Sequence, residues 1–243
     1  MSIVKINWSG GKDSTASVLL HLEAGDTCKV VFYVPMLTDE IPLISKAHYN
    51  FIMRTAKWFK SQGCKVYRAK GTTYWEYIHT QITRGKNKGK YKGYALGFGY
   101  CEFRRDSKVK ALNSLKLKYD YQDIGIAADE IKRHSQLNTT LRSILVEKNY
   151  TEQDAFELCK DKGLLSPHYN VSKRDGCVIC PYTKPKEWLE WLNDFPRGEQ
   201  ALREIDEFCK TANIKPQKLP HYDQRNFSET IEYIRNRDKC YKQ

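Results

Sequence analysis

The sequence lacks several features that would place it in a large class of proteins. No run of about 18 apolar residues occurs, the length that a transmembrane helix needs, so we expect no membrane partner. The first residues, MSIVKINWSGG, lack the apolar core of a secretory signal peptide. Internal repeats are absent, and so are a Ser/His/Asp pattern and a carboxylate pair suited to acid–base work. These absences argue against a membrane protein, a repeat protein and the best-known kinds of hydrolase.

Negative charge is also scarce. The chain has 41 Lys and Arg residues against 29 Asp and Glu residues, which gives a formal net charge of +12 and a pI of about 9.2. This excess favours an anionic partner, which could be a nucleotide, a nucleic acid or both. The alternative is a lysine-rich surface that is only solvated, and the charge alone does not decide between them.

Apolar periodicity predicts an α/β fold for the first part of the chain. Segments with the pattern of strands alternate with helical segments, which indicates a doubly wound, mostly parallel sheet. The predicted strands are residues 3–8, 29–36, 65–69 and 121–129, and the long helices between them are residues 13–25 and 43–63. After residue 150 the pattern becomes helical and carries cysteines. We therefore expect an α/β domain over residues 1–150 and a helical, cysteine-bearing lobe over residues 151–243.

A glycine-containing stretch, SGGKDS, follows the first predicted strand. Its members are Ser9, Gly10, Gly11, Lys12, Asp13 and Ser14. Adjacent glycines allow a tight turn and a close approach to a ligand. A helix that begins here directs its unpaired N–H groups at that ligand, and Lys12 adds a full positive charge. The stretch therefore predicts a loop that binds phosphate.

This hexapeptide resembles the PP-loop of the adenine nucleotide α-hydrolase superfamily, also called the N-type ATP pyrophosphatases, whereas the Walker pattern is absent. The resemblance implies a fold of the PP-loop type in which residues 9–14 bind ATP, usually with Mg²⁺. It implies an enzyme in which an acceptor oxygen attacks the α-phosphate, giving an adenylate and pyrophosphate. Lys12 and Asp13 would be its catalytic residues. For Asp13, a structural role in the first turn of the helix is the alternative.

Three further segments are similar to phosphoadenosine phosphosulfate (PAPS) reductase-like members of this superfamily. They are YCEFRRDSKVKALN at 100–113, IGIAADEIKRHS at 124–135 and CKDKGLLSPHYNVSKRDGCVICP at 159–181. Where the family often has Arg, this chain has Ala127, so the resemblance moves that anion contact to Arg133 or removes it. Where the family often has an acidic motif after the second strand, only Asp39 or Glu40 can take its place.

The eight cysteines are scattered along a chain that we expect in the cytoplasm, which favours reduced thiols or metal ligands over disulfides. Cys177 and Cys180 form a C-x-x-C pair, which supplies half of a four-ligand metal site. We predict Cys101 and Cys159 as the other ligands, with Cys209 as the rival for the fourth place. The wide spacing favours a 4Fe-4S cluster, with Zn²⁺ as the alternative metal. The competing interpretation is four small buried side chains.

A basic stretch, RGKNKGKYKGY, covers residues 84–94. Its lysines and interleaved tyrosines suit a nucleic-acid backbone and a stacked base. A solvated surface loop is the other interpretation.

The leading functional hypothesis is an enzyme that adenylates an acceptor, with nucleic acid favoured, for sulfur transfer from a donor protein. The alternatives are a PAPS or adenosine phosphosulfate reductase of sulfate assimilation, and a non-catalytic module that binds nucleotide or nucleic acid. Release of pyrophosphate from ATP, release of sulfite, and ATP binding without turnover would separate these three. The sequence leaves the acceptor, the sulfur donor and the oligomeric state open.

Overall fold

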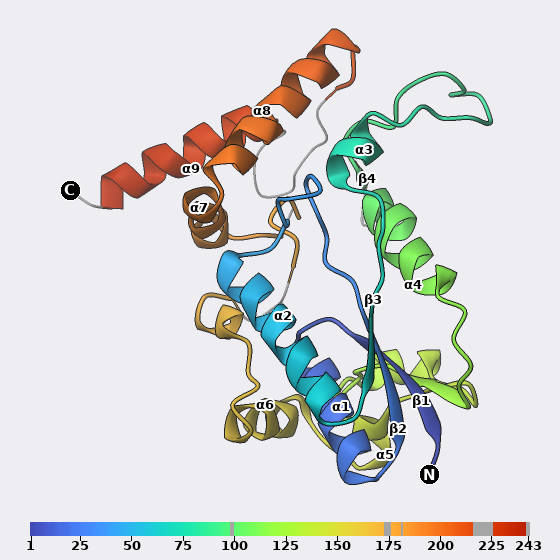
Figure 1. Ribbon diagram of the computed structural model, residues 1–243. Coiled ribbons are helices and arrows are strands. Elements are labelled where there is room, and N and C mark those ends of the chain that lie inside the picture. Colours follow the sequence, from blue (N-terminus) through green and yellow to red (C-terminus); the bar gives the residue numbers. More distant parts are fainter. Residues whose placement is uncertain (98–99, 173–175, 181, 216–225, 242–243) are drawn as a thin grey trace. The chain divides into compact units, whose positions relative to one another are not determined.

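The structure is a computed structural model that describes residues 1–97, 100–172, 176–180, 182–215 and 226–241 (Figure 1). The chain divides into two compact units. Unit 1 comprises Met1–Val34, Ala47–Lys70 and Ala111–Asp175, and unit 2 comprises Pro35–Lys46, Gly71–Lys110 and Gly176–Gln243. This division differs from the predicted single boundary near residue 150. Residues 151–175 belong to unit 1, and two segments from the first half of the chain belong to unit 2.

Unit 1 contains a five-stranded sheet in the order β3-β2-β1-β6-β7, with every neighbouring pair parallel. The strands are β1 (Ile3–Trp8), β2 (Thr27–Phe32), β3 (Lys65–Arg68), β6 (Tyr121–Asp123) and β7 (Leu141–Arg142). The predicted parallel sheet and four of its strands are confirmed. The strand predicted over 121–129 is shorter than expected, because β6 ends at Asp123 before the chain turns.

Helices cover both faces of this sheet, as the alternation of β2 side chains shows. Phe32 lies with its ring centroid 5.7 Å from that of Trp8, which in turn packs at 5.0 Å on Phe59 of α2 (Lys46–Ser61). The neighbouring Val31 points to the opposite face and is buried beside Ala111 of α4 (Lys110–Ser114). The fold is therefore the doubly wound α/β class that the sequence predicts.

The helix that follows β1 is α1 (Lys12–Glu23), and two later helices, α5 (Ile144–Glu147) and α6 (Glu152–Asp161), pack against it (Figure 1). Their shared core contains Ala16, Leu20, Leu145 and Cys159. The start of α6 is fixed by a capping box between Thr151 and Asp154. These contacts explain why residues 151–175 belong to unit 1.

Unit 2 is mostly helical around an aromatic core. Its elements are α3 (Tyr74–Ile78), β4 (Leu96–Gly97), β5 (Tyr100–Cys101), the π-helix η1 (Arg104–Val109), α7 (Pro185–Asp194), α8 (Pro196–Thr211) and α9 (Phe227–Tyr241). Trp188 and Trp191 are fully buried, and the Trp191 indole donates to the Pro42 carbonyl at 2.8 Å. Asp206 accepts hydrogen bonds from the first turn of α9. Among the described helices of the chain, none has both the length and the apolar character that crossing a membrane requires.

A buried polar network ties α1 to the sheet. His21, in the last turn of α1, lies between two carboxylates, with Nδ1 3.0 Å from Asp26 and Nε2 3.2 Å from Asp123. Asp123 is fully buried and also accepts the N–H of Ile144 at 2.8 Å. Burial lowers the pKa of His21, but the hydrogen bonds and charges of the two carboxylates outweigh burial, so this pKa is raised above its ordinary value of 6.5.

We expect His21→Gln to lower the free energy of unfolding by about 3 kcal/mol near pH 6, because it leaves two carboxylates without their buried cation. A histidine whose pKa is raised by folding stabilises the protein fully below its unfolded pKa of 6.5. That contribution is lost as the pH rises through the folded value. The difference between wild type and variant in urea unfolding should therefore shrink as the pH rises above about 6.5. A difference that stays constant or grows with pH would contradict a protonated His21.

Candidate functional site

The candidate site lies at the carboxyl end of β1, at the point where the strand order reverses between β1 and β6. Ligands of doubly wound sheets bind at this kind of switch point. The chain turns here on Gly10, whose φ is +85°. A Cβ added at Gly10 would lie 2.8 Å from Cγ1 of Ile52 and 3.0 Å from Cε1 of His48. Both the backbone conformation and the lack of space therefore require glycine at this position.

The two serines of the loop hold its shape. The Ser14 hydroxyl accepts the N–H of Ser9 and donates to the Gly11 carbonyl, both at 3.1 Å. The Ser9 hydroxyl accepts the N–H of Gly11 at 3.2 Å and lies 3.1 Å from the Ser14 hydroxyl. The predicted loop residues are thus brought together, and the serine hydroxyls organise the turn from which α1 begins.

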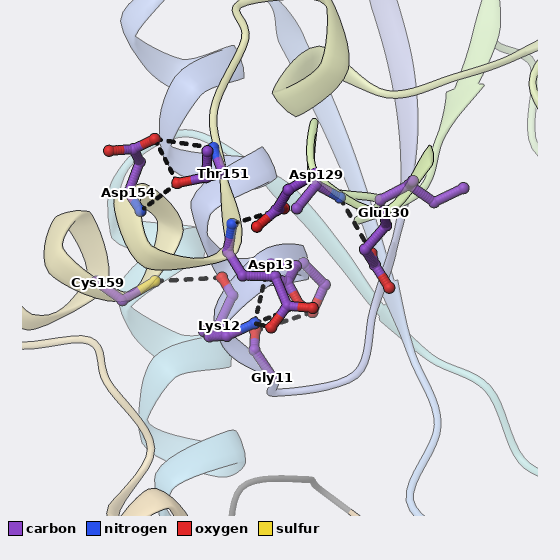
Figure 2. Close-up of polar contacts among 12 residues, drawn as sticks. Gly11, Lys12, Asp13, Asp129, Glu130, Thr151, Asp154 and Cys159 are labelled. Carbon is purple, nitrogen blue, oxygen red and sulfur yellow. Dashed lines mark hydrogen bonds and ion pairs between the residues drawn. The ribbon is translucent and has the colours of Figure 1, made fainter. Parts of the chain in front are cut away.

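Lys12 is the first residue of α1, and its side chain forms ion pairs with two carboxylates beside the loop (Figure 2). Its ammonium lies 2.8 Å from Oδ1 of Asp13 and 3.0 Å from Oε2 of Glu152, and its backbone N–H donates to the Tyr169 hydroxyl at 2.9 Å. Burial lowers the pKa of Lys12, but its hydrogen bonds and ion pairs with the two carboxylates outweigh this effect and raise it. Lys12 is therefore a cation at neutral pH.

Burial raises the pKa of Asp13, and the nearby carboxylates of Glu152 and Glu130 raise it further, whereas Lys12 lowers it. An acidic side chain in the first turn of a helix complements the helix dipole. The geometry of Asp13 thus agrees with the structural role considered above. Its catalytic role stays a prediction.

The segment after β6 forms the second wall of the site. A Cβ added at Gly125 would lie 2.7 Å from the backbone N of Ser14 and 2.8 Å from the carbonyl carbon of Asp13. Only glycine allows this close approach of two backbones. The segment then folds back on itself, with the Ala127 N–H donating to the Glu130 carboxylate at 3.1 Å.

The sequence also predicts nucleotide contacts from Arg133 and Asp39. Arg133 is engaged by Glu130, with Nη1 at 2.8 and 2.9 Å from its two carboxylate oxygens. Asp39 belongs to unit 2, in the turn closed by the hydrogen bond from the Leu37 N–H to the Ile41 carbonyl. A role for Arg133 or Asp39 in binding nucleotide therefore stays a prediction.

Of the four predicted metal ligands, Cys159 belongs to unit 1. It is buried in the core shared by α1, α5 and α6, and its thiol donates to the Lys12 carbonyl at 3.3 Å (Figure 2). Burial raises the pKa of Cys159 to about 12, so the thiol stays protonated at neutral pH. Cys159 thus supports the first turn of α1, which is a structural role.

Cys101, Cys177, Cys180 and the rival ligand Cys209 belong to unit 2. Burial raises the pKa of Cys101 and of Cys177, and the nearby Cys180 raises both further. Cys209 is packed in the aromatic core. Within the residues that the structure describes, no three His, Cys, Asp or Glu side chains are placed to hold a metal ion. Part of the segment around the pair, residues 173–175 and 181, lies outside the described residues. The iron–sulfur cluster and the zinc site are therefore not supported.

The basic stretch forms a hairpin-like loop in unit 2. Its base is closed by the bridge between Gln81 and Tyr91, and residues 84–90 are exposed. Tyr91 packs edge-on against Phe208, and the buried Tyr94 donates to Asp206 at 2.7 Å. The buried Tyr94 therefore cannot stack on a base, whereas stacking by the half-buried Tyr91 stays a prediction. Lys92, the last basic residue of the stretch, forms an ion pair in which its ammonium lies 2.8 Å from the Asp106 carboxylate.

Several residues contact the loop although no sequence pattern predicts these contacts. Glu152 and Tyr169 contact Lys12 directly, and His48 lies against Gly10 with its Nδ1 2.7 Å from the Ser166 hydroxyl. Tyr169 belongs to the 159–181 segment that contains the C-x-x-C pair, but nothing in the sequence predicts its contact with the loop. No local pattern pointed to Glu152 or His48.

Fold and site together define a doubly wound α/β protein with a lysine and a tight glycine turn at the switch point of its sheet. No family model matches the chain, and no curated protein matches it. Among solved structures the chain is similar to a 4-thiouridine synthetase in complex with RNA and with bound ATP, at 13% identity and a TM-score of 0.39. The match covers 87% of this chain and 53% of that one, so the chain spans about half the length of the synthetase.

We expect Gly125→Ala to lower the free energy of unfolding by about 3 kcal/mol, because the new methyl group meets backbone atoms that cannot rotate away. Gly163→Ala is the matched control. Gly163 has a φ of +66° but open space around the added Cβ, so its substitution should cost about 1 kcal/mol through strain alone. Urea unfolding measures both. Equal losses in the two variants would show that the close approach at Gly125 does not constrain the fold.

Proposed function

We propose that this chain is an ATP-dependent PP-loop enzyme, similar to PAPS reductase-like proteins, that adenylates an acceptor in preparation for sulfur transfer. The observation that carries the proposal is the position of Lys12. Its ammonium and its backbone N–H stand together in the first turn of α1, beside a tight glycine turn at the switch point of a parallel sheet. Backbone donors, the helix dipole and a lysine combine here in the way that a polyphosphate requires.

The proposed reaction uses these groups to stabilise a leaving group. An acceptor oxygen attacks the α-phosphorus of ATP and forms a new P–O bond, while the bond from the α-phosphorus to the α,β-bridging oxygen breaks. The bonding electrons leave with pyrophosphate, on which negative charge accumulates. Lys12 and the N–H groups of the first turn are preorganised donors for that charge. Asp13 would be the carboxylate that holds Mg²⁺ together with phosphate oxygens, and the metal would supply positive charge to offset that of the leaving group.

Nucleic acid is the acceptor that we favour. The net charge of +12 supports this choice, and so does the exposed tip of the basic loop, which carries Arg84, Lys86, Lys88 and Lys90. The exposed tip, residues 84–90, carries no aromatic side chain and therefore contributes charge rather than base stacking. It would therefore bind the phosphate backbone and leave the choice of sequence to other parts of the protein.

The first test concerns Lys12. We expect Lys12→Ala to weaken ATP binding by about 1.5–3 kcal/mol, the size of a hydrogen bond to a charged group. Lys162→Ala is the matched control, because Lys162 is an exposed lysine of unit 1 whose nearest carboxylate, on Glu23, is 3.8 Å away. Isothermal titration calorimetry measures both affinities. An unchanged affinity in Lys12→Ala would remove the basis of the proposed function.

The second test concerns the basic loop. If its tip holds a nucleic-acid backbone, affinity should fall with salt at a logarithmic slope of about −0.7 per contacted phosphate on single strands. Replacing Arg84, Lys86, Lys88 and Lys90 by Ser should make the slope less negative by up to about 2.8 units. A variant with the same loss of charge elsewhere is the control, with Ser in place of the exposed Lys57, Lys60, Lys116 and Lys118. Fluorescence anisotropy with single-stranded RNA and DNA measures the slopes. Equal slopes in the two variants would show that the loop does not contact the nucleic acid.

A further inference from the structure

Both donors of Lys12 are already engaged by one later part of unit 1. The backbone N–H donates to the Tyr169 hydroxyl at 2.9 Å, and the ammonium donates to the Glu152 carboxylate at 3.0 Å. Glu152 is the first residue of α6, and Tyr169 lies in the 3₁₀-helix η3 (Pro167–Asn170) that follows it. These are the same two donors that the proposed function assigns to phosphate.

The segment that carries the two side chains, which we call the α6–η3 segment (residues 152–170), is held firmly in place. The backbone N–H of Glu152 donates to Asp129 at 3.0 Å, and the capping box of Thr151 fixes the start of α6 (Figure 2). Tyr169 packs edge-on against Phe156 of α6, with ring centroids 6.3 Å apart. Glu152 and Tyr169 are therefore presented to Lys12 by a packed element.

The chemistry of the two groups matches that of a phosphate. A carboxylate oxygen and a phenolic oxygen are acceptors for the same N–H donors that bind phosphate oxygens. Glu152 also adds a second negative charge beside Asp13, and like charges at this range repel an incoming anion. A polyphosphate must therefore compete with Glu152 for the ammonium and with Tyr169 for the backbone donor.

We propose that Glu152 and Tyr169 are internal ligands of the loop, which occupy the donors of Lys12 until a polyphosphate displaces them and which thereby lower its affinity. This inference rests on the proposed function, because it concerns the same site. Binding of polyphosphate and withdrawal of these two side chains from Lys12 are then linked. An effector that binds only when Glu152 and Tyr169 are away from Lys12 should strengthen nucleotide binding. By the reciprocity of linkage, the nucleotide should strengthen binding of that effector by the same factor.

Calorimetric titration with inorganic pyrophosphate tests the inference, because this probe reports on the phosphate subsite without the base or ribose. We expect Glu152→Gln and Tyr169→Phe each to bind pyrophosphate at least threefold more tightly than wild type. Glu157→Gln is the control for the first variant, since it removes the same charge from an exposed position on α6. Tyr150→Phe, a half-buried tyrosine of unit 1 away from the loop's hydrogen bonds, is the control for the second. Both controls should bind as wild type does.

Hydrogen exchange gives a second readout that needs no variant. Saturating pyrophosphate should increase amide exchange in η3, which loses the contact of Tyr169 with Lys12, while it protects residues 9–14 of the wild-type protein. Unchanged or weaker binding by Glu152→Gln and Tyr169→Phe, with wild type still binding, would overturn the inference and leave the proposed function standing. Loss of protection at the loop together with no binding by any of the proteins would overturn the proposed function, and the inference with it.

Discussion

Gly125 brings the backbone that follows β6 against the first turn of α1, at a distance that leaves no room for a side chain. This contact joins the two strands between which the sheet order reverses. It fixes where α1 begins, and hence where Lys12 and its backbone N–H are placed. On the other side of the turn, Ile52 and His48 close the space around Gly10. The loop is thus confined from both directions by packed elements of unit 1.

Electrostatics then decide what the confined loop can do. Lys12 supplies the positive charge, and it is stabilised as a cation by Asp13 and Glu152 although burial opposes this. The protonated thiol of Cys159 supports the same turn through the Lys12 carbonyl. The Tyr169 hydroxyl accepts a hydrogen bond from the backbone N–H of Lys12. The arrangement places the Lys12 ammonium and the first backbone N–H of α1 together, and acceptors on Glu152 and Tyr169 satisfy both donors.

The sequence predicts the sheet, the loop and its residues 9–14, because these depend on local periodicity and on the conformational needs of adjacent residues. It does not predict the contacts of Lys12 with Glu152 and Tyr169, which lie 140 and 157 residues further along the chain and depend on how α6 packs. The cysteines illustrate the same limit. The C-x-x-C spacing specifies a local turn, but only the fold could show that Cys159 bonds to a carbonyl in unit 1. Each unit is built from three separate segments of the chain, and the amino-acid composition does not predict this division.

We propose that the loop around Lys12 positions ATP for attack at the α-phosphorus. Phosphorus-31 NMR of ATP incubated with the protein, Mg²⁺ and a mixture of RNA and single-stranded DNA tests this claim most directly, because it identifies which bond of the triphosphate breaks. The account predicts AMP or an adenylated product together with inorganic pyrophosphate in equal amount. Formation of ADP and orthophosphate, or ATP that remains intact, would contradict it.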